Sequence, residues 1–501
     1  MTTASPAFDD VIVGAGTAGA VLAGRLSEDA ARRVLLVEAG PDPAGPDEPP
    51  DTLGIPVVSG HNWDYRAHVG PDPTGREALY PLGRLVGGTS AINGAIALRG
   101  LPGDFDAWAA AGNPDWAWDR VLPYYVALEA AAGPVPICRA GPDDLGVLAA
   151  AFLSACRHVG LPDLPDPNAG PHPGAGPIPC NGRDRRRMSS ARTHLGPARR
   201  RRNLTVWQRC VASRVLLGAG RATGVEVVRD GALVRVAAGR VTLAAGGIGT
   251  PAVLQRSGIG PAGRLAALGI RPRADLPGVG RNLVDHPAVP IWTHPRAGDC
   301  RPGDPWYQVM ARIASDGGEP DLAVFLAANI MTGDLPEAGG ALGARIGAMI
   351  SPVLLRPESR GSVFLRTPEP DTPPCIVLSL ASAPRDVDRL MRAVRLAWSI
   401  VRAPDFAAHL SRVLVWTDRM VAEDRLLRSA LARWTVPLFH AAGTARMGPA
   451  DDDQAVVDQR CRVHGIADLL VADASVLPSQ PSAPPSLTCV MLAERVAGWM
   501  T

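Results

Sequence analysis

Three glycines near the N-terminus have the spacing of a phosphate-binding turn. Gly14, Gly16 and Gly19 form the pattern G-x-G-x-x-G directly after an apolar run, Asp10 to Val13. Gly14 permits a tight turn, Gly16 lets a pyrophosphate approach the backbone, and Gly19 allows the following helix to pack closely on a sheet. This pattern predicts a strand, a turn and a helix that together hold a dinucleotide.

An acidic residue completes the pattern one helix and one strand further along the chain. The second apolar run, Val34 to Val37, is followed by Glu38 and Ala39. We expect the Glu38 carboxylate to accept hydrogen bonds from the adenosine ribose, while the phosphates face the N–H groups of Thr17 and Ala18 at the positive end of the helix. A glycine-rich turn in an ordinary α/β protein is the alternative interpretation.

The composition narrows the class of protein. A chain of 501 residues is too long for a single core and predicts two or more domains. The net charge of only +2, from 51 basic and 49 acidic residues, provides no field that favours nucleic acid or an anionic membrane. No lysine occurs, which excludes lysine chemistry such as a Schiff base.

The cysteines indicate a reducing compartment. The eight cysteines lie far apart, and none belongs to a C-x-x-C pair or to a cluster with zinc spacing. We therefore expect no metal site, and reduced thiols in a cytoplasmic protein. The apolar stretch from Val11 to Leu26 is broken by glycines that the turn needs, so we expect neither a signal peptide nor a membrane span.

Short periodic segments predict the remaining elements. Apolar residues at helical spacing predict helices at Asp386 to Val401 and, after Pro484 and Pro485, at Leu487 to Trp499. Proline-rich stretches at 41–56 and 162–179 are expected to be irregular. Short β-like runs separated by turn residues predict a meander and two later strands, at 204–207, 215–217, 224–228, 233–236, 240–243, 363–365 and 376–380.

Several blocks distributed along nearly the whole chain carry a family resemblance. They are PLGRLVGGTSAING at 81–94, AAGGIGTP at 244–251, LPGVGRNL at 276–283 with Asp285-His286-Pro287, RPESRG at 356–361, HAAGTARMG at 440–448 and VADAS at 471–475. Together they resemble the glucose–methanol–choline (GMC) oxidoreductases, a family of FAD-dependent alcohol oxidases and dehydrogenases. The first two blocks are similar to the two signatures of that family.

The resemblance implies an α/β fold with a discontinuous Rossmann-like FAD-binding domain and an inserted α+β substrate domain that carries an antiparallel sheet. The implied boundaries are 1–125, 195–292 and 435–501 for the FAD-binding domain, and 126–194 and 293–434 for the substrate-binding domain. FAD is expected to be non-covalent, because Ile92 stands where some relatives carry a histidine that bonds to the flavin. The implied cofactor-binding residues are Gly14, Gly16, Thr17, Ala18, Gly19, Glu38, Ala39, Leu85, Asn93, Gly94, Ala95, Ile96, Val211, Phe439, Asp473, Ala474 and Pro485.

His440 matches the catalytic histidine of the family. The resemblance implies that this imidazole takes the hydroxyl proton of an alcohol, while a hydride passes from carbon to flavin N5. Imidazole has a pKa suited to accepting a proton near neutral pH. His286 and His464, by contrast, are expected to be structural.

Pro484 departs from the family pattern. Relatives carry a second catalytic histidine or asparagine at this position, and a proline side chain neither donates nor accepts a hydrogen bond. The helix after Pro485 would still direct its positive end at the flavin pyrimidine, where reduction places negative charge. Ser482 or Ser486 is a candidate to replace the missing group, and an insertion or deletion that shifts the alignment is an alternative.

The sequence therefore predicts a GMC-type FAD-dependent enzyme that oxidises the CH–OH group of a small alcohol, apolar or aromatic. One alternative is a flavoenzyme of the same fold with lyase, decarboxylase or other biosynthetic chemistry, and another is a flavin-binding protein without catalysis. The partners are a small-molecule substrate and an electron acceptor, either oxygen or another molecule. Aromatic walls of the substrate pocket are expected from Trp306, Tyr307, Phe325, Trp416 and Trp434.

Overall fold

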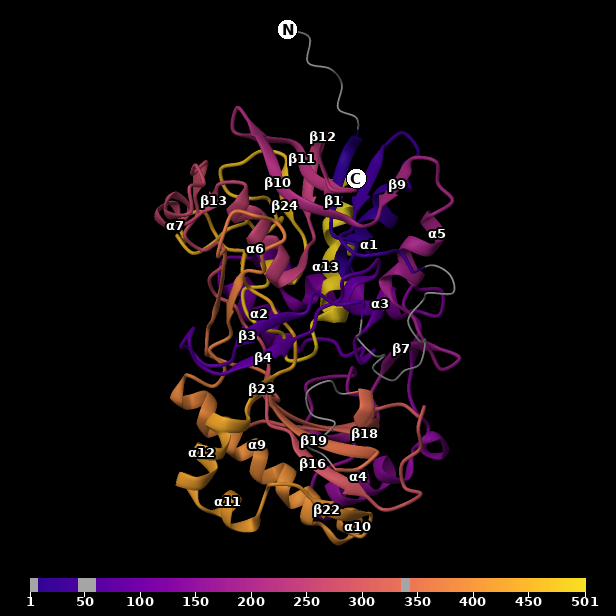
Figure 1. Ribbon diagram of the computed structural model, residues 1–501. Coiled ribbons are helices and arrows are strands. Elements are labelled where there is room, and N and C mark those ends of the chain that lie inside the picture. The colour runs from indigo at the N-terminus through magenta and orange to yellow at the C-terminus, as the bar shows by residue number, and fades with distance from the viewer. Residues whose placement is uncertain (1–7, 44–59, 335–342) are drawn as a thin grey trace.

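Two large sheets organise the protein (Figure 1). The computed structural model describes residues 8–43, 60–334 and 343–501. The first sheet, with the helices α1 and α13, occupies the upper half of Figure 1, and the second sheet lies below it. Most of the proline-rich stretch expected at 41–56 falls outside the described residues.

The first sheet has seven strands in the order β10-β11-β12-β1-β2-β9, with β24 beside β12. Its centre is parallel, because β1 pairs in parallel with β12 and β2, β2 with β9, and β12 with β24. β10 and β11 extend it as an antiparallel meander. The strands are β1 (Phe8–Val13), β2 (Val34–Val37), β9 (Leu204–Trp207), β10 (Cys210–Gly218), β11 (Arg221–Arg229), β12 (Ala232–Leu243) and β24 (Leu469–Val471).

The sequence reading of this sheet needs two changes. The run at 204–207 is a strand, β9, but it does not join the predicted meander, because it pairs in parallel with β2 at the opposite edge of the sheet. The predicted runs at 233–236 and 240–243 form a single strand, β12, since Ala237 continues the pairing with β11 and Ala238 begins the pairing with β1. β2 and β24 are buried along their whole length, as expected for parallel strands covered on both faces. The helices α1 (Thr17–Leu26) and α13 (Ser486–Met500) pack against this sheet and against each other.

The second sheet has eight strands in the order β22-β16-β19-β18-β17-β6, with β15 and β23 paired at one end. Its neighbouring strands are antiparallel. β6 lies within the stretch 162–179, so the expectation of a wholly irregular connection there is wrong: its glycines and alanine pair with β17. The strands are β6 (Gly174–Pro177), β15 (Pro287–Ala288), β16 (Ile291–Pro295), β17 (Tyr307–Ile313), β18 (Leu322–Met331), β19 (Ile346–Leu354), β22 (Leu410–Val413) and β23 (Val436–Pro437).

Residue alternation along β18 gives the second sheet two different faces. Leu322, Val324 and Leu326 belong to the core shared with the helices, whereas Ala323 and Phe325 belong to a separate apolar cluster on the opposite face. The first of these faces is covered by the five helices α4 (Val147–His158), α9 (Pro384–Arg402), α10 (Pro404–Ala407), α11 (Asp418–Ala422) and α12 (Asp424–Trp434). The opposite face is therefore free to form a wall of a cavity.

Smaller elements connect the two sheets. A four-stranded sheet, β20-β21-β3-β4, contains β3 (Tyr65–His68), β4 (Glu77–Tyr80), β20 (Ser362–Phe364) and β21 (Cys375–Val377). The strand predicted at 376–380 is shorter than expected, because Ser379 and Ala381 have positive φ angles that end it. The remaining elements are α2 (Pro102–Ala110), α3 (Trp118–Glu129), α5 (Gly196–Ala198), α6 (Gly246–Arg256), α7 (Ala262–Ala267), β5 (Ile137–Cys138), β7 (Cys180–Arg183), β8 (Arg186–Arg187), β13 (Ile259–Gly260) and β14 (Ala274–Asp275).

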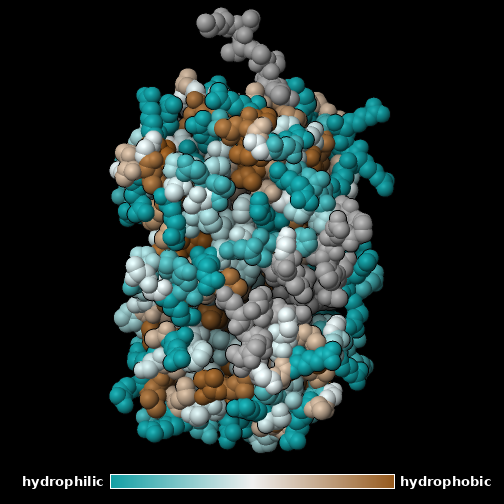
Figure 2. Space-filling view, viewed as in Figure 1, coloured by the Kyte–Doolittle hydropathy of each residue, from teal (hydrophilic) through white to brown (hydrophobic). Residues whose placement is uncertain are grey.

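The outside of the protein is mainly hydrophilic in the view of Figure 2, with small apolar areas between hydrophilic side chains. A helix capable of spanning a membrane does not occur in the described part of the chain. All eight cysteines are free thiols.

Candidate active site

The carboxyl ends of four parallel strands meet at one cavity. β1 ends at Val13 before Gly14, β2 ends before Glu38, β12 ends before Ala244, and β24 ends two residues before Asp473. All of these positions line a cavity of about 560 Å³. Ligands of open α/β sheets bind at this edge, outside the carboxyl ends of the strands.

The three motif glycines allow a very close approach of backbones. Gly14 has a φ of +100°, and a Cβ there would lie 2.5 Å from the carbonyl oxygen of Ala244. A Cβ at Gly19 would lie 1.8 Å from the oxygen of Gly14, so this glycine packs α1 against the turn. A Cβ at Gly88 would lie 2.6 Å from Gly16 Cα. The turn therefore holds its shape only with glycine at positions 14, 19 and 88.

Glu38 lies at the same end of the cavity and is tied to the backbone. Its Oε2 accepts a hydrogen bond from Ala15 N at 2.9 Å, and its Oε1 accepts one from Gly40 N at 2.8 Å. Burial raises the pKa of Glu38 to about 7, against these hydrogen bonds, which lower it. Each carboxylate oxygen has a second lone pair with which it can accept a ribose hydroxyl.

Two helices begin in the wall of the cavity without a capping side chain. The N-cap residues of α1 and α13 are Gly16 and Pro485, and neither supplies a side-chain hydrogen bond. The start of α6 is different, because Asp473 accepts hydrogen bonds from Gly246 N and Thr250 Oγ1. The positive ends of α1 and α13 are therefore directed at the cavity and favour an anionic ligand there.

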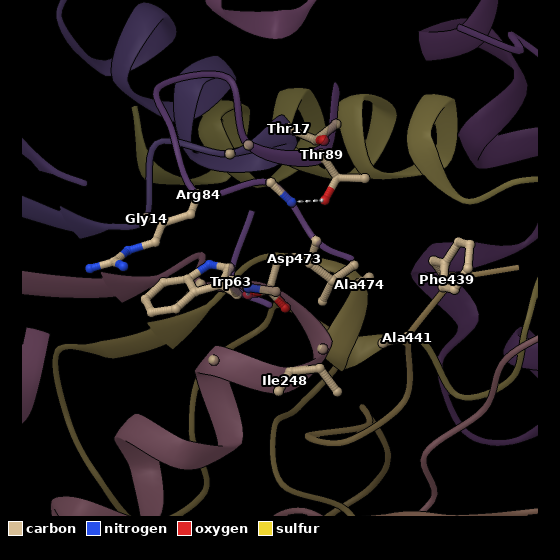
Figure 3. Close-up of a pocket in the computed structure, with 18 of the residues that line it drawn as sticks. Gly14, Thr17, Trp63, Arg84, Thr89, Ile248, Phe439, Ala441, Asp473 and Ala474 are labelled. Carbon is tan, nitrogen blue, oxygen red and sulfur yellow. Dashed lines mark hydrogen bonds between the residues drawn. The ribbon is translucent and has the colours of Figure 1, made fainter. Parts of the chain in front are cut away.

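Figure 3 shows the extent of the cavity. Trp63 and Arg84 lie side by side at one end, with the Arg84 guanidinium 4.8 Å from the centre of the Trp63 ring. Phe439 and Ala441 lie at the other end, and Asp473 lies between the two. The cavity thus runs from the dinucleotide turn to the chain segment that contains His440.

His440 is held at that second end by a strained backbone and a buried carboxylate. Phe439, directly before it, has a φ of +64°, and the ring of Phe439 packs edge-on against Tyr80. His440 N donates to Asp285 Oδ1 at 3.1 Å, and the Tyr80 hydroxyl donates to Asp285 Oδ2. Burial raises the pKa of Asp285 to about 7, and burial together with Asp285 raises that of Tyr80, which keeps its proton.

A second histidine contacts His440. His286 Nδ1 lies 2.8 Å from His440 Nδ1, and the two rings are perpendicular, with centroids 5.0 Å apart. Burial lowers the pKa of His286 to about 4 and lowers the pKa of His440 well below its usual 6.5. His286, expected to be structural, is therefore a direct partner of the candidate base.

Apolar side chains of the second sheet surround the cavity near His440. Tyr307 and Phe325, both expected as aromatic walls, line the cavity together with Ser351, Val353 and Leu438. The expectation for the three tryptophans is wrong. Trp416 and Trp434 pack in the core between the sheet and its helices, on the face turned away from the cavity, and Trp306 is not among the lining residues.

Pro484 lines the cavity, and the two serines near it differ. Ser482 Oγ donates to Asp104 Oδ1 at 2.7 Å and accepts from Arg356 Nε at 2.7 Å, so it is engaged outside the cavity. Ser486 does line the cavity and accepts from Asn93 Nδ2 at 3.4 Å. Of the two candidates for the missing polar group, only Ser486 is placed to face a ligand.

The structure brings most of the sequence-predicted site residues to this one cavity. Three are exceptions: Leu85 and Ala95 are fully buried behind the wall, and Gly19 packs under the turn. The sequence reading missed Tyr80, Asp285, His286, Trp63 and Arg84. The lining residues that it named are Gly14, Gly16, Thr17, Ala18, Glu38, Ala39, Asn93, Gly94, Ile96, Val211, Phe439, His440, Asp473, Ala474 and Pro485.

These residues fit FAD. The cavity volume of about 560 Å³ lies within the roughly 300–1,000 Å³ usual for ligand sites. Because the turn before α1 has glycine at positions 14 and 16, a pyrophosphate there would face backbone and no side chain at these positions. Glu38 supplies an acceptor for the ribose, and the start of α1 supplies a positive helix end for the phosphates. Fold and site together are those of a dinucleotide-dependent oxidoreductase, with an imidazole in the wall of the cavity.

The comparisons with known proteins agree with this class. Family models described as GMC oxidoreductase match residues 8–288 and 357–493. The chain belongs to the GMC oxidoreductase family. It is therefore an FAD-dependent enzyme that acts on alcohols.

Three relatives illustrate the range of the family around this chain. The 5-(hydroxymethyl)furfural oxidase of Methylovorus sp. (strain MP688) is 36% identical, with 98% of each chain covered. An oxygen-dependent choline dehydrogenase of Rhizobium etli is 33% identical, with 94% of this chain and 91% of the relative covered. The crystal structure of pyridoxine 4-oxidase from Mesorbium loti superposes with a TM-score of 0.88 at 33% identity, covering 98% of this chain and 99% of the other.

Proposed function

We propose that this enzyme oxidises a hydroxymethyl group carried by a small aromatic or heteroaromatic ring, with His440 as the general base. The observation that carries this proposal is the chamber beside His440. Tyr307, Phe325, Val353 and Leu438 belong to one apolar cluster and also line the cavity. Aromatic rings pack favourably against such edges and faces.

The chamber favours an uncharged ring over a quaternary ammonium substrate. The lining residues contributed by β17, β18, β19 and 438–440 include no carboxylate. A cation such as choline would lose its water there without gaining a counter-ion, a cost that the rings of Tyr307 and Phe325 would offset only in part. Two of the relatives, the 5-(hydroxymethyl)furfural oxidase and pyridoxine 4-oxidase, are named for ring-bearing alcohols, which supports the same choice.

The residues at the two ends of the cavity suggest separate roles for the cofactor, the base and the apolar wall. FAD, when bound, supplies the oxidant for the carbon–hydrogen bond. His440 accepts the hydroxyl proton, because its lowered pKa leaves the imidazole unprotonated near neutral pH. The apolar wall excludes water and orients the ring of the substrate.

We also propose the domain division and the form of the cofactor. The first sheet falls within 1–125, 195–292 and 435–501, which we assign to FAD, while 126–194 and 293–434 are assigned to substrate. Non-covalent FAD is proposed because Ile92, which lines the cavity, offers only an alkyl side chain. The cytoplasmic location stays a prediction.

Anaerobic reduction of the purified flavoenzyme tests the proposed reaction. We expect 5-(hydroxymethyl)furfural, pyridoxine or benzyl alcohol to bleach the flavin absorbance at least about tenfold faster than choline. Faster bleaching by choline would contradict the aromatic assignment. Turnover of a candidate substrate with no bleaching by any alcohol would instead support the lyase alternative.

The electron acceptor is found with the same preparation. The enzyme reduced by its best alcohol is mixed with oxygen or, separately, with an artificial dye acceptor. Rapid return of the oxidised spectrum with oxygen identifies an oxidase, and return with the dye alone identifies a dehydrogenase.

A further inference from the structure

The hydrogen bonds of His286 determine where its proton lies. Its Nε2 is 3.0 Å from the carbonyl oxygen of Leu355 and 3.0 Å from that of Pro481. Carbonyl oxygens only accept hydrogen bonds, so Nε2 must carry the hydrogen that both share. The imidazole of His286 is buried and its pKa is lowered to about 4, so the ring is neutral and its Nδ1 bears a lone pair.

A neighbouring amide agrees with this assignment. Gln480 Nε2, which only donates, lies 3.1 Å from the carbonyl oxygen of His440 and 3.4 Å from His286 Nδ1. The carbonyl of His440 fixes the orientation of the amide, because an amide oxygen in that position would face another acceptor. The donor nitrogen of Gln480 is therefore directed at His286 Nδ1, as expected for an acceptor.

The same reasoning then fixes the tautomer of His440. Its Nδ1 lies 2.8 Å from His286 Nδ1, and two lone pairs cannot face each other at that distance. Because His286 Nδ1 accepts, His440 Nδ1 must donate. The hydrogen of the neutral His440 ring is thus on Nδ1, and Nε2 is left with the free lone pair.

We infer that His286 is a positioning residue that locks His440 in the Nδ1–H tautomer, so that Nε2 is the atom that takes the proton of the alcohol. The inference rests on the proposed function of His440 as base. In the proton-transfer step the alcohol O–H bond breaks, a new N–H bond forms at Nε2, and the electron pair stays on the alcohol oxygen. The resulting imidazolium keeps its Nδ1–H bond to His286, which stabilises the added charge.

The contact with His286 supports a base that Pro484 does not assist. Pro484 lines the same cavity but offers no side-chain hydrogen bond, whereas His286 contacts the ring of His440 directly. One dipeptide fixes both ends of His440, because Asp285 accepts from its backbone N–H while His286 accepts from its ring. A base oriented by a third group is a general device of enzymes that abstract hydroxyl protons.

The direct test is the tautomer of His440 in the FAD-loaded enzyme without substrate. Nitrogen NMR of protein labelled at histidine distinguishes a protonated from an unprotonated ring nitrogen, and the signals lost in His440→Ala identify the residue. We expect a protonated Nδ1 and an unprotonated Nε2 in the wild type. A protonated Nε2 would overturn the inference, even if alcohols reduce the flavin.

Two substitutions of His286 separate positioning from packing. In His286→Gln the side-chain oxygen can accept from His440 Nδ1 and the amide can donate to Leu355 and Pro481, so we expect the same tautomer and flavin reduction within about tenfold of wild type. In His286→Leu the acceptor is lost. There we expect mixed tautomers and reduction slowed by at least about 10², with FAD still bound.

His464 provides the matched control. Its Nε2 also lies near a backbone carbonyl, that of Gly448 at 3.1 Å, but it does not line the cavity. His464→Leu should leave the rate of flavin reduction unchanged. If His286→Leu does not fold, the wild-type tautomer and the His286→Gln variant decide the matter. An unchanged tautomer and rate in a folded His286→Leu variant would refute the role of His286.

Discussion

Replacing Gly16 with alanine probes the FAD site with little disturbance to the protein itself. A Cβ at Gly16 would lie 3.9 Å from Gly88 Cα, an ordinary van der Waals distance, and its φ of −75° suits any residue. Gly16 is the N-cap of α1, where alanine is less favourable than glycine by up to about 1 kcal/mol. We expect the free energy of unfolding of the FAD-free protein to fall by no more than that.

Alanine at Gly88, the other residue of this contact, is expected to destabilise the protein far more. Gly88 has a φ of +51°, and its Cβ would lie 2.6 Å from Gly16 Cα. The left-handed backbone costs an alanine about 1–2 kcal/mol, and the overpacking costs about 1–3 kcal/mol more. Gly88→Ala should therefore lower the free energy of unfolding by roughly 2–5 kcal/mol.

The cofactor distinguishes the two variants. The Gly16 methyl group would stand where the pyrophosphate approaches the backbone, so we expect the FAD dissociation constant to rise at least about tenfold, or about 1.4 kcal/mol. Urea denaturation of the FAD-free protein and titration followed by flavin fluorescence measure the two quantities separately. Unchanged FAD affinity in a folded Gly16→Ala protein would refute the placement of the pyrophosphate at this turn.

Three further outcomes are expected. His440→Ala should keep the FAD spectrum while flavin reduction slows by at least about 10²; equal rates would remove His440 from the reaction. The reduction rate of the wild type should be full above the lowered pKa of His440 and be lost as pH falls through it, so a stopped-flow pH profile with its acid limb at or above 6.5 would contradict that shift. Tyr80→Phe removes the hydroxyl that donates to the buried Asp285 carboxylate and should lower the free energy of unfolding, measured by urea titration, by about 1.5–3 kcal/mol. An unchanged free energy of unfolding would show that backbone donors alone satisfy Asp285.

Local patterns were sufficient for the elements whose periodicity and turn chemistry agree. The strand–turn–helix at 8–26, the meander from 210 to 243, and α9 and α13 follow from glycine spacing, alternation and helical spacing. β18 shows where this reasoning fails. Nine of its ten residues are apolar, Asn329 being the exception, and both faces are buried, so periodicity does not separate a strand from a buried helix. Only the family resemblance implied an antiparallel sheet in that region.

The parts of the candidate site that lie within one short segment could be predicted from the sequence. Contacts between residues of distant segments could not. The dinucleotide turn and Glu38 lie within one short stretch of chain. The contact between His286 and His440 joins residues far apart in sequence, and the pairing of β15 with β23 together with the bridge between Val284 and Ala442 brings their segments together. Ser482 was misjudged for the same reason, because its partners Asp104 and Arg356 come from distant parts of the chain.

The wall of the cavity is built from the first and the last elements of the chain. The turn after β1 faces the start of α13, and α1 packs against α13 along its length. Contacts between such distant segments form late, and ribosomes deliver the N-terminal part of a chain first. The contact between α1 and α13 therefore forms only after α13 has been synthesised, long after β1 and α1. We expect FAD to bind only after α13 has packed against α1, so a chain truncated before Ser486 should lack the flavin colour.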